Sequence, residues 1–225
     1  MDILYVNRIP FLLCKSSGIN YLHVTKLKSR GKKELRRKLK FIKPKYTKRG
    51  YIISSVHGDN EYYHEDIKEV FSDSDINICA KDEHVPGIER AVRTVKDRVR
   101  SLCHSVPYKR FTKLMTIHVV LTEVKWINVF PFKTGVSNTL SPETLLDGKE
   151  QPDLSIKRIP FGSYALIYTV TNNNMSKRST PAIALSESNG AGGFYFMSLY
   201  SGKRLHSNKW TELPPDEGII QKVMD

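Results

Sequence analysis

The feature of this sequence that most constrains its fold is the order in which short apolar runs and longer helical stretches follow one another. Three short runs of apolar or alternating residues come first, at residues 2–6, 10–14 and 21–27. Polar and glycine-containing segments separate them and are typical of tight turns. The start of the chain is therefore predicted to form a three-stranded antiparallel meander.

Strands and helices then alternate as far as residue 148. Two further strands are expected, at residues 51–56 and 76–80. Helices are expected at residues 31–42, 61–71, 87–105 and 111–130, with a short one beginning at Ser141. This order predicts an α/β fold with a mixed sheet and helices on its faces.

Beyond Gln151 the sequence changes to short β-like runs separated by turns rich in Asn, Ser and Gly. Such a pattern is typical of a small all-β module. We therefore expect two domains, a core at residues 1–150 and a β-rich C-terminal module at residues 155–215.

Positive charge is concentrated in one segment. Residues 26–50 contain thirteen Lys or Arg and a single acid, Glu34, so they carry +12 of the formal net charge of +13. Concentrated basic charge is the electrostatic pattern of a protein that binds a polyanion, and nucleic acid is the first candidate. A solvated helix face or a nuclear-import signal would look the same. The expected phosphate contacts in this block are Lys32, Lys33, Arg36 and Arg37.

Membrane spans, secretion and disulfide frameworks are not expected. The chain has no apolar run of about 18 to 20 residues, and Asp2 and Arg8 interrupt any signal-peptide core. Its three cysteines, Cys14, Cys79 and Cys103, are widely spaced and match neither a disulfide framework nor a zinc pair. We expect reduced thiols in a soluble nuclear or cytoplasmic protein, with no membrane partner.

Three acids occupy positions that such a fold could bring together: Asp2 opens the first strand, Asp59 follows the strand at 51–56, and Glu89 begins the long helix. Clustered carboxylates repel one another unless cations neutralise them, and their oxygen ligands suit Mg²⁺ or Mn²⁺. Such a cluster could support phosphoryl transfer. Taken alone, each acid is equally compatible with an ordinary surface position.

The long helix has two distinct faces. At about 100° per residue, Glu89, Arg93, Lys96 and Arg100 lie within about 60° of one another. The apolar residues of the same helix form a separate face. The basic residues could hold a phosphate backbone near Glu89, whereas an ion pair between Glu89 and Arg93 on an exposed surface is the simpler alternative.

These motifs resemble the integrase region of copia-type long-terminal-repeat retrotransposon polyproteins. The resemblance is carried by three segments: MDILYVNRIPF at residues 1–11, VHGDN at 56–60 and HVPGIER at 84–90. Shorter matches are WIN at residues 126–128, GVS at 135–137, LSP at 140–142, FGSY at 161–164 and WTELP at 210–214.

The resemblance implies a ribonuclease H-like core in which Asp2, Asp59 and Glu89 bind Mg²⁺ or Mn²⁺. It also implies 3′-end processing of element DNA and strand transfer into target DNA. Association of the chain into homo-oligomers is compatible with the sequence, which leaves the number of subunits open. The chain would then be a fragment or decayed copy of such an integrase. Two alternatives stay open: a basic DNA- or RNA-binding remnant without activity, and a ribonuclease H-like nuclease.

Overall fold

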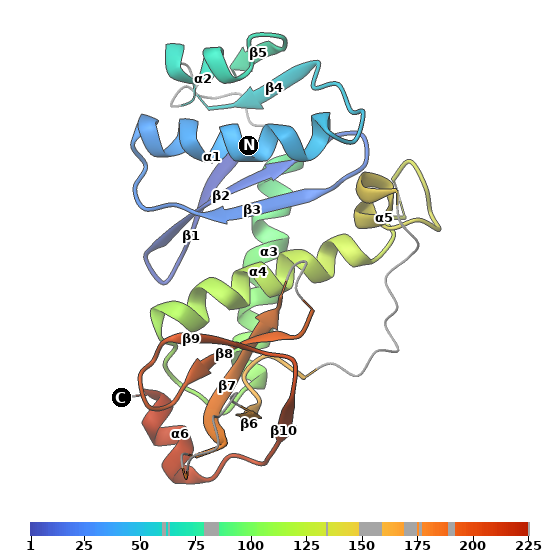
Figure 1. Ribbon diagram of the computed structural model, residues 1–225. Coiled ribbons are helices and arrows are strands. Elements are labelled where there is room, and N and C mark those ends of the chain that lie inside the picture. Colours follow the sequence, from blue (N-terminus) through green and yellow to red (C-terminus); the bar gives the residue numbers. More distant parts are fainter. Residues whose placement is uncertain are drawn as a thin grey trace. The chain divides into compact units, whose positions relative to one another are not determined.

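In a computed structural model of the chain (Figure 1), the residues described are 1–59, 62, 64–78, 86–133, 135–148, 159–168, 175, 177–188 and 192–224. The chain divides into two compact units. The first unit consists of Met1–Asp97 and Val124–Asp153, and the second consists of Arg98–Glu123 and Leu154–Asp225. The assignment of domains to residues 1–150 and 155–215 stays a prediction.

The first unit contains the expected meander. Strands β1 (Asp2–Val6), β2 (Ile9–Lys15) and β3 (Leu22–Lys26) form an antiparallel sheet in the order β1-β2-β3. The β1–β2 hairpin turns through Asn7 and Arg8, whose positive φ angles of 46° and 63° match the twist of the two strands. The meander is confirmed.

Consecutive residues of β2 show that this sheet is covered on both faces. Phe11, Leu12 and Leu13 are all fully buried, although neighbouring side chains of a strand point to opposite faces. A sheet buried on both sides is typical of the α/β class. The α/β fold class, with three antiparallel strands followed by alternating strands and helices, is confirmed.

Strands β4 (Ser55–Gly58) and β5 (Asp75–Ile78) form a separate parallel pair. The predicted strand at 51–56 therefore begins four residues late, because β5 first lies opposite β4 at Ser55 and leaves residues 51–54 without a partner strand. The backbone nitrogen of Met1 donates a hydrogen bond of 2.7 Å to the carbonyl of His57. That contact places β4 beside the start of β1, although the hydrogen-bond ladders of the two sheets are separate in the described residues.

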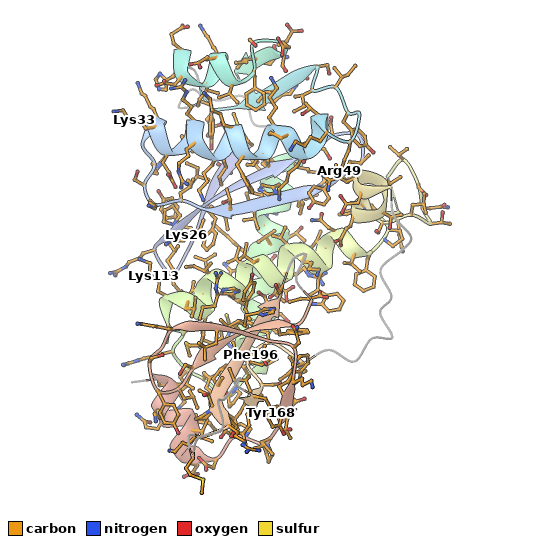
Figure 2. The ribbon with its side chains drawn as sticks, in the orientation of Figure 1. Lys26, Lys33, Arg49, Lys113, Tyr168 and Phe196 are labelled. Carbon is orange, nitrogen blue, oxygen red and sulfur yellow. The ribbon has the colours of Figure 1, made fainter. Side chains whose placement is uncertain are left out.

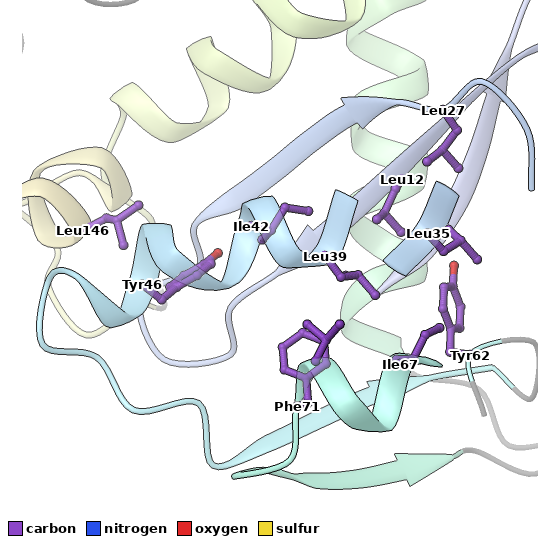
Figure 3. Packing of buried hydrophobic residues seen from close by; sticks show 11 residues of the cluster. Leu12, Leu27, Leu35, Leu39, Ile42, Tyr46, Tyr62, Ile67, Phe71 and Leu146 are labelled. Atoms are coloured by element: carbon purple, nitrogen blue, oxygen red, sulfur yellow. The ribbon is translucent and has the colours of Figure 1, made fainter. Parts of the chain in front are cut away.

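Helix α1 (Lys32–Thr47) packs on the sheet, and α2 (Glu65–Val70) packs on α1. Figure 3 shows the buried face of α1, from Leu35 through Leu39 and Ile42 to Tyr46, against residues of β2 and α2. Helix α1 was expected at residues 31–42 but continues past Pro44 to Thr47. Tyr46 explains the difference, because its buried ring anchors the last turn against the core and outweighs the hydrogen bond that proline removes.

Two longer helices and a short one follow. Helix α3 (Pro86–Ser105) and helix α4 (Lys113–Val129) agree closely with the expected ranges, and each contributes to both units. In α5 (Pro142–Asp147), the expected N-cap is confirmed, since the Ser141 hydroxyl accepts a hydrogen bond from Thr144 N at 3.1 Å. None of the described helices has the length and apolar character that a membrane crossing requires.

Asn128 at the end of α4 covers part of the sheet edge within the first unit. Its side-chain oxygen accepts from Leu22 N at 2.8 Å, and its side-chain nitrogen donates to Leu22 O at 2.7 Å. An amide side chain here replaces the pairing that a fourth strand would give to β3. The buried asparagine thus satisfies two backbone groups at an otherwise open edge.

The second unit contains the expected all-β sheet. It consists of β6 (Tyr164–Tyr168), β7 (Ser179–Glu187), β8 (Phe194–Ser198), β9 (Arg204–Ser207) and β10 (Trp210–Glu212), in the order β10-β6-β7-β8-β9. Its core includes Phe194 and Phe196, which both pack on Trp210. Helix α6 (Glu217–Met224) and β10 were not expected from the sequence.

Candidate nucleic-acid interface and acidic site

The three candidate acids come from one end of the first unit. Asp2 begins β1, and Asp59 directly follows β4, whose His57 contacts Met1. Glu89 lies in the first turn of α3. Burial lowers the pKa of Lys15 at the end of β2, and the nearby Arg90 guanidinium lowers it further, so the start of α3 lies near the same end of the sheet.

The side chains of Asp2, Asp59 and Glu89 are not grouped as the ligands of one metal ion in the structure. Among the described residues, no three His, Cys, Asp or Glu side chains are grouped so that they could hold a metal ion. Asp59 and Glu89 are exposed, and Oδ1 of Asp2 accepts a hydrogen bond of 2.6 Å from Ile3 N. Their assignment as catalytic residues and as ligands of Mg²⁺ or Mn²⁺ therefore stays a prediction, and no chemical step is derived through a metal.

Some residues of the predicted motifs are not among those that the structure describes. Asn60, which the VHGDN motif contains, is one of them, and so are His84 and Val85 before α3. Cys79 also lies outside the described residues. Cys14 and Cys103 are free thiols, and burial raises the pKa of Cys14 to about 11, so this thiol is held protonated and unreactive at neutral pH.

Helix α3 presents the two faces that its sequence predicts. Ile88, Ala91 and Val95 are buried on one side. On the other side Glu89 and Arg93 are exposed, and Lys96 is partly exposed. Within the described chain Arg93 and Lys96 make no ion pair, so both cations are available to a phosphate; Arg100 follows on the part of α3 that belongs to the second unit.

Much of the basic block is neutralised by acids of the same unit. Arg36 forms ion pairs with Glu69 and, at 3.5 Å, with Asp66 of α2. Lys40 also pairs with Glu69, at 3.5 Å. Since α2 contacts α1 closely along this side, these cations stabilise the packing of two helices and are less available to a phosphate.

Arg37 is likewise engaged, because its side chain donates two hydrogen bonds of 2.8 Å to Glu34. The Arg37 hydrogen bond, followed by the backbone of Lys28, lowers the pKa of Glu34 to about 2, despite a smaller opposing effect of burial. Lys32 and Lys33 are exposed at the N-terminal end of α1, where Figure 2 shows Lys33. Whether Lys32, Lys33, Arg36 and Arg37 contact nucleic acid stays a prediction.

Sequence reasoning did not single out the side of α1 that faces β3. There Lys38 and Lys45 contact side chains of β3, and Phe41 lies between them on the surface. The available signal was the helical period: at about 100° per residue, Lys38, Phe41 and Lys45 share one side of the helix, and Arg36, Lys40 and Lys43 share the other. Counting the charges of residues 26–50 together does not distinguish these two sides of α1.

Comparisons with known proteins give likenesses among solved structures. No family model matches the chain, and no curated protein matches it. Among solved structures, the chain is similar to the catalytic core domain of BIV integrase in crystal form I, with 13% sequence identity and a TM-score of 0.48. The match covers 66% of this chain and 91% of that chain.

Proposed function

We propose that the chain is a DNA-binding core of the integrase type. The observation that carries the proposal is the exposed side of α3, where Arg93 and Lys96 follow Glu89 at helical spacing beside the end of the sheet at which Asp2 and Asp59 lie. Two cations on a helix, which form no ion pair with any residue that the structure describes, suit a phosphate backbone, which they would position without reading its sequence.

The finer proposal concerns chemistry at the three acids. Asp2, Asp59 and Glu89 are the residues that would hold Mg²⁺ or Mn²⁺, which supplies charge neutralisation for phosphoryl transfer when it is bound. The resemblance to copia-type integrases supports 3′-end processing and strand transfer as the reactions. Element ends and target DNA would be the substrates.

A second candidate is a DNA- or RNA-binding protein that does not catalyse. The observation in its favour is that the described residues contain no assembled group of three metal-binding side chains. In this case the cations of α3 would still bind phosphate, and Glu89 would have no chemical role.

Binding of DNA tests the proposal itself. Wild-type chain should bind duplex oligonucleotides with an affinity that falls as salt rises, because binding releases counterions. Replacing Arg93 and Lys96 with Gln should weaken binding to all sequences alike and lower the slope of log affinity against log salt by about 0.9 for each lost contact. Wild-type chain that binds no DNA, or a double variant with an unchanged slope, would contradict the proposed interface.

Strand transfer in the presence of Mg²⁺ or Mn²⁺ separates the two candidates. The finer proposal expects transfer products from wild-type chain, none from Glu89→Gln, and normal amounts from Asp97→Asn, which changes an exposed acid two turns further along α3. Calorimetry should record uptake of divalent ions that Asp59→Asn abolishes. Salt-sensitive binding with neither products nor ion uptake would establish the non-catalytic candidate.

A further inference from the structure

One side of α1 carries two lysines with an exposed aromatic ring between them. Lys38, Phe41 and Lys45 lie along this side, which we name the β3 flank, because both lysines contact side chains of β3. A rise of 1.5 Å per residue places the two lysines about 10.5 Å apart along the helix axis. Phe41 lies between them.

The lysines of the β3 flank donate to neutral groups. Lys38 Nζ donates to Oγ1 of Thr25 at 3.1 Å, and Lys45 Nζ lies 3.4 Å from Nδ1 of His23. Neither lysine forms an ion pair within the described part of the chain. The acids nearest to them are engaged elsewhere: Glu34 with Arg37 at 2.8 Å, and Asp147 with Arg49 at 2.5 Å.

Positive charge is crowded on this flank. Burial lowers the pKa of Lys38, and the charge of Arg37 lowers it further, against an opposing effect of Glu34 and with smaller contributions from Lys26 and Lys28. Burial also lowers the pKa of Lys45, with help from the neighbouring cation Arg49 and against a smaller opposing effect of Asp147. Cations that raise one another's energy in this way are stabilised by an anion between them.

Phe41 adds an apolar surface that the fold does not use. Its side chain is 67% exposed, and Lys45 Nζ lies 5.5 Å from the centroid of its ring. An aromatic ring between cations is the arrangement by which proteins bind single-stranded nucleic acid, since the ring stacks on a base while the cations contact phosphates. In a duplex the faces of the bases are already stacked and are closed to the ring.

We propose that the β3 flank binds a single-stranded segment of nucleic acid, with Phe41 stacked on a base and Lys38 and Lys45 on the phosphates at either side. The proposal rests on the nucleic-acid-binding function proposed above. It adds a second binding surface besides α3 and a preference of that surface for single strands. Frayed ends of a DNA duplex and single-stranded RNA share this chemistry. Ribose and deoxyribose oligonucleotides of equal sequence distinguish the two sources.

The test measures binding of fluorescent single-stranded and duplex oligonucleotides to the full chain. Phe41→Ala should weaken single-strand binding about tenfold and leave duplex binding within about twofold. The double variant Lys38→Gln/Lys45→Gln should lower the single-strand salt slope by about 1.4, that is, by about 0.7 for each contact. Lys40→Gln/Lys43→Gln is the matched control, because it removes the same charge from the opposite side of α1.

Thermal unfolding of each variant establishes that the fold persists, which the exposure of Phe41 leads us to expect. Equal losses in the two lysine pairs, or equal losses of single-strand and duplex binding in Phe41→Ala, would overturn the inference while leaving the proposed function intact. Loss of duplex binding in Arg93→Gln/Lys96→Gln with single-strand binding retained would support two separate surfaces. Competition by phosphatidylserine vesicles that depends on Phe41 would overturn it in favour of a membrane surface.

Discussion

The two sides of α1 carry similar numbers of cations but face different surroundings. Along the side of α1 that faces α2, Arg36, Lys40 and Lys43 meet the acids Asp66, Glu69 and Asp73. Along the β3 flank, the hydrogen-bond partners of Lys38 and Lys45 within the described residues are a threonine and a histidine. One flank therefore holds two helices together, and the other retains its charge.

This difference limits what a charged segment reveals about its partner. The acids that pair with the α2-facing side of α1 come from about 30 residues further along the chain, with Arg36 and Glu69 separated by 33 positions. Side chains on the two flanks alternate within each helical turn, so no window of sequence separates them without a helical projection. Whether a cation of α1 is available to a ligand therefore depends on which residues pack beside it in the folded protein.

Replacing Leu39 should have the largest effect, because both flanks depend on the same buried face. Leu39 is 1% exposed and packs in the core beneath α1 (Figure 3). Leu39→Ala should lower the free energy of unfolding by about 2 to 5 kcal/mol, through lost apolar burial and the cavity that remains. Urea unfolding measures the change. Lys40→Ala, at the adjacent exposed position, should unfold close to wild type, and equal losses in the two variants would contradict this packing.

Low pH should decrease the free energy of unfolding, because His23 of β3 is buried beside the β3 flank. Burial, with the charges of Lys45 and Lys38, lowers the pKa of His23 to about 3. The unfolded chain, in which this group has its ordinary pKa near 6.5, therefore binds the proton first. The contribution of neutral His23 is complete above about pH 6.5 and is lost as the pH falls from there toward 3, by a few kcal/mol at 1.36 kcal/mol per pKa unit.

Urea unfolding at a series of pH values tests this dependence. His23→Gln should flatten the decline between pH 6.5 and 4. A decline remains in His23→Gln because burial, and to a smaller extent Arg204, lowers the pKa of His118 in the second unit to about 4. If His23→Gln and wild type decline in parallel, His23 is not buried as a neutral group.

Local patterns were enough to predict much of the fold. The meander follows from apolar runs separated by turns, and α3 follows from a sustained helical period with an apolar face. Short elements with a small apolar face were missed, and β10 has only three residues. Helix α6 had a usable signal, since Asp216 caps it by accepting from Ile219 N at 2.8 Å.

Features that depend on tertiary contacts could not be predicted. The continuation of α1 past Pro44 depends on burial of Tyr46, and the late start of β4 depends on where β5 begins. The candidate site shows the same limit: sequence order brought Asp2, Asp59 and Glu89 to one end of the first unit, but side-chain directions decide whether three carboxylates can share an ion.

The smallest expected effect is also the most direct test of the difference between the flanks. Glu69 pairs with both Arg36 and Lys40, whereas the ion-pair partner of Glu65 among the described residues is Lys68 of its own helix, at 3.0 Å. Glu69→Gln and Glu65→Gln thus change the net charge equally, but only Glu69→Gln releases cations of α1. Glu69→Gln should raise duplex affinity severalfold at low salt and steepen the salt slope by about 0.9 for each new phosphate contact. If Glu65→Gln raises affinity as much, net charge rather than released cations governs binding, and the two flanks do not differ in the way their contacts indicate.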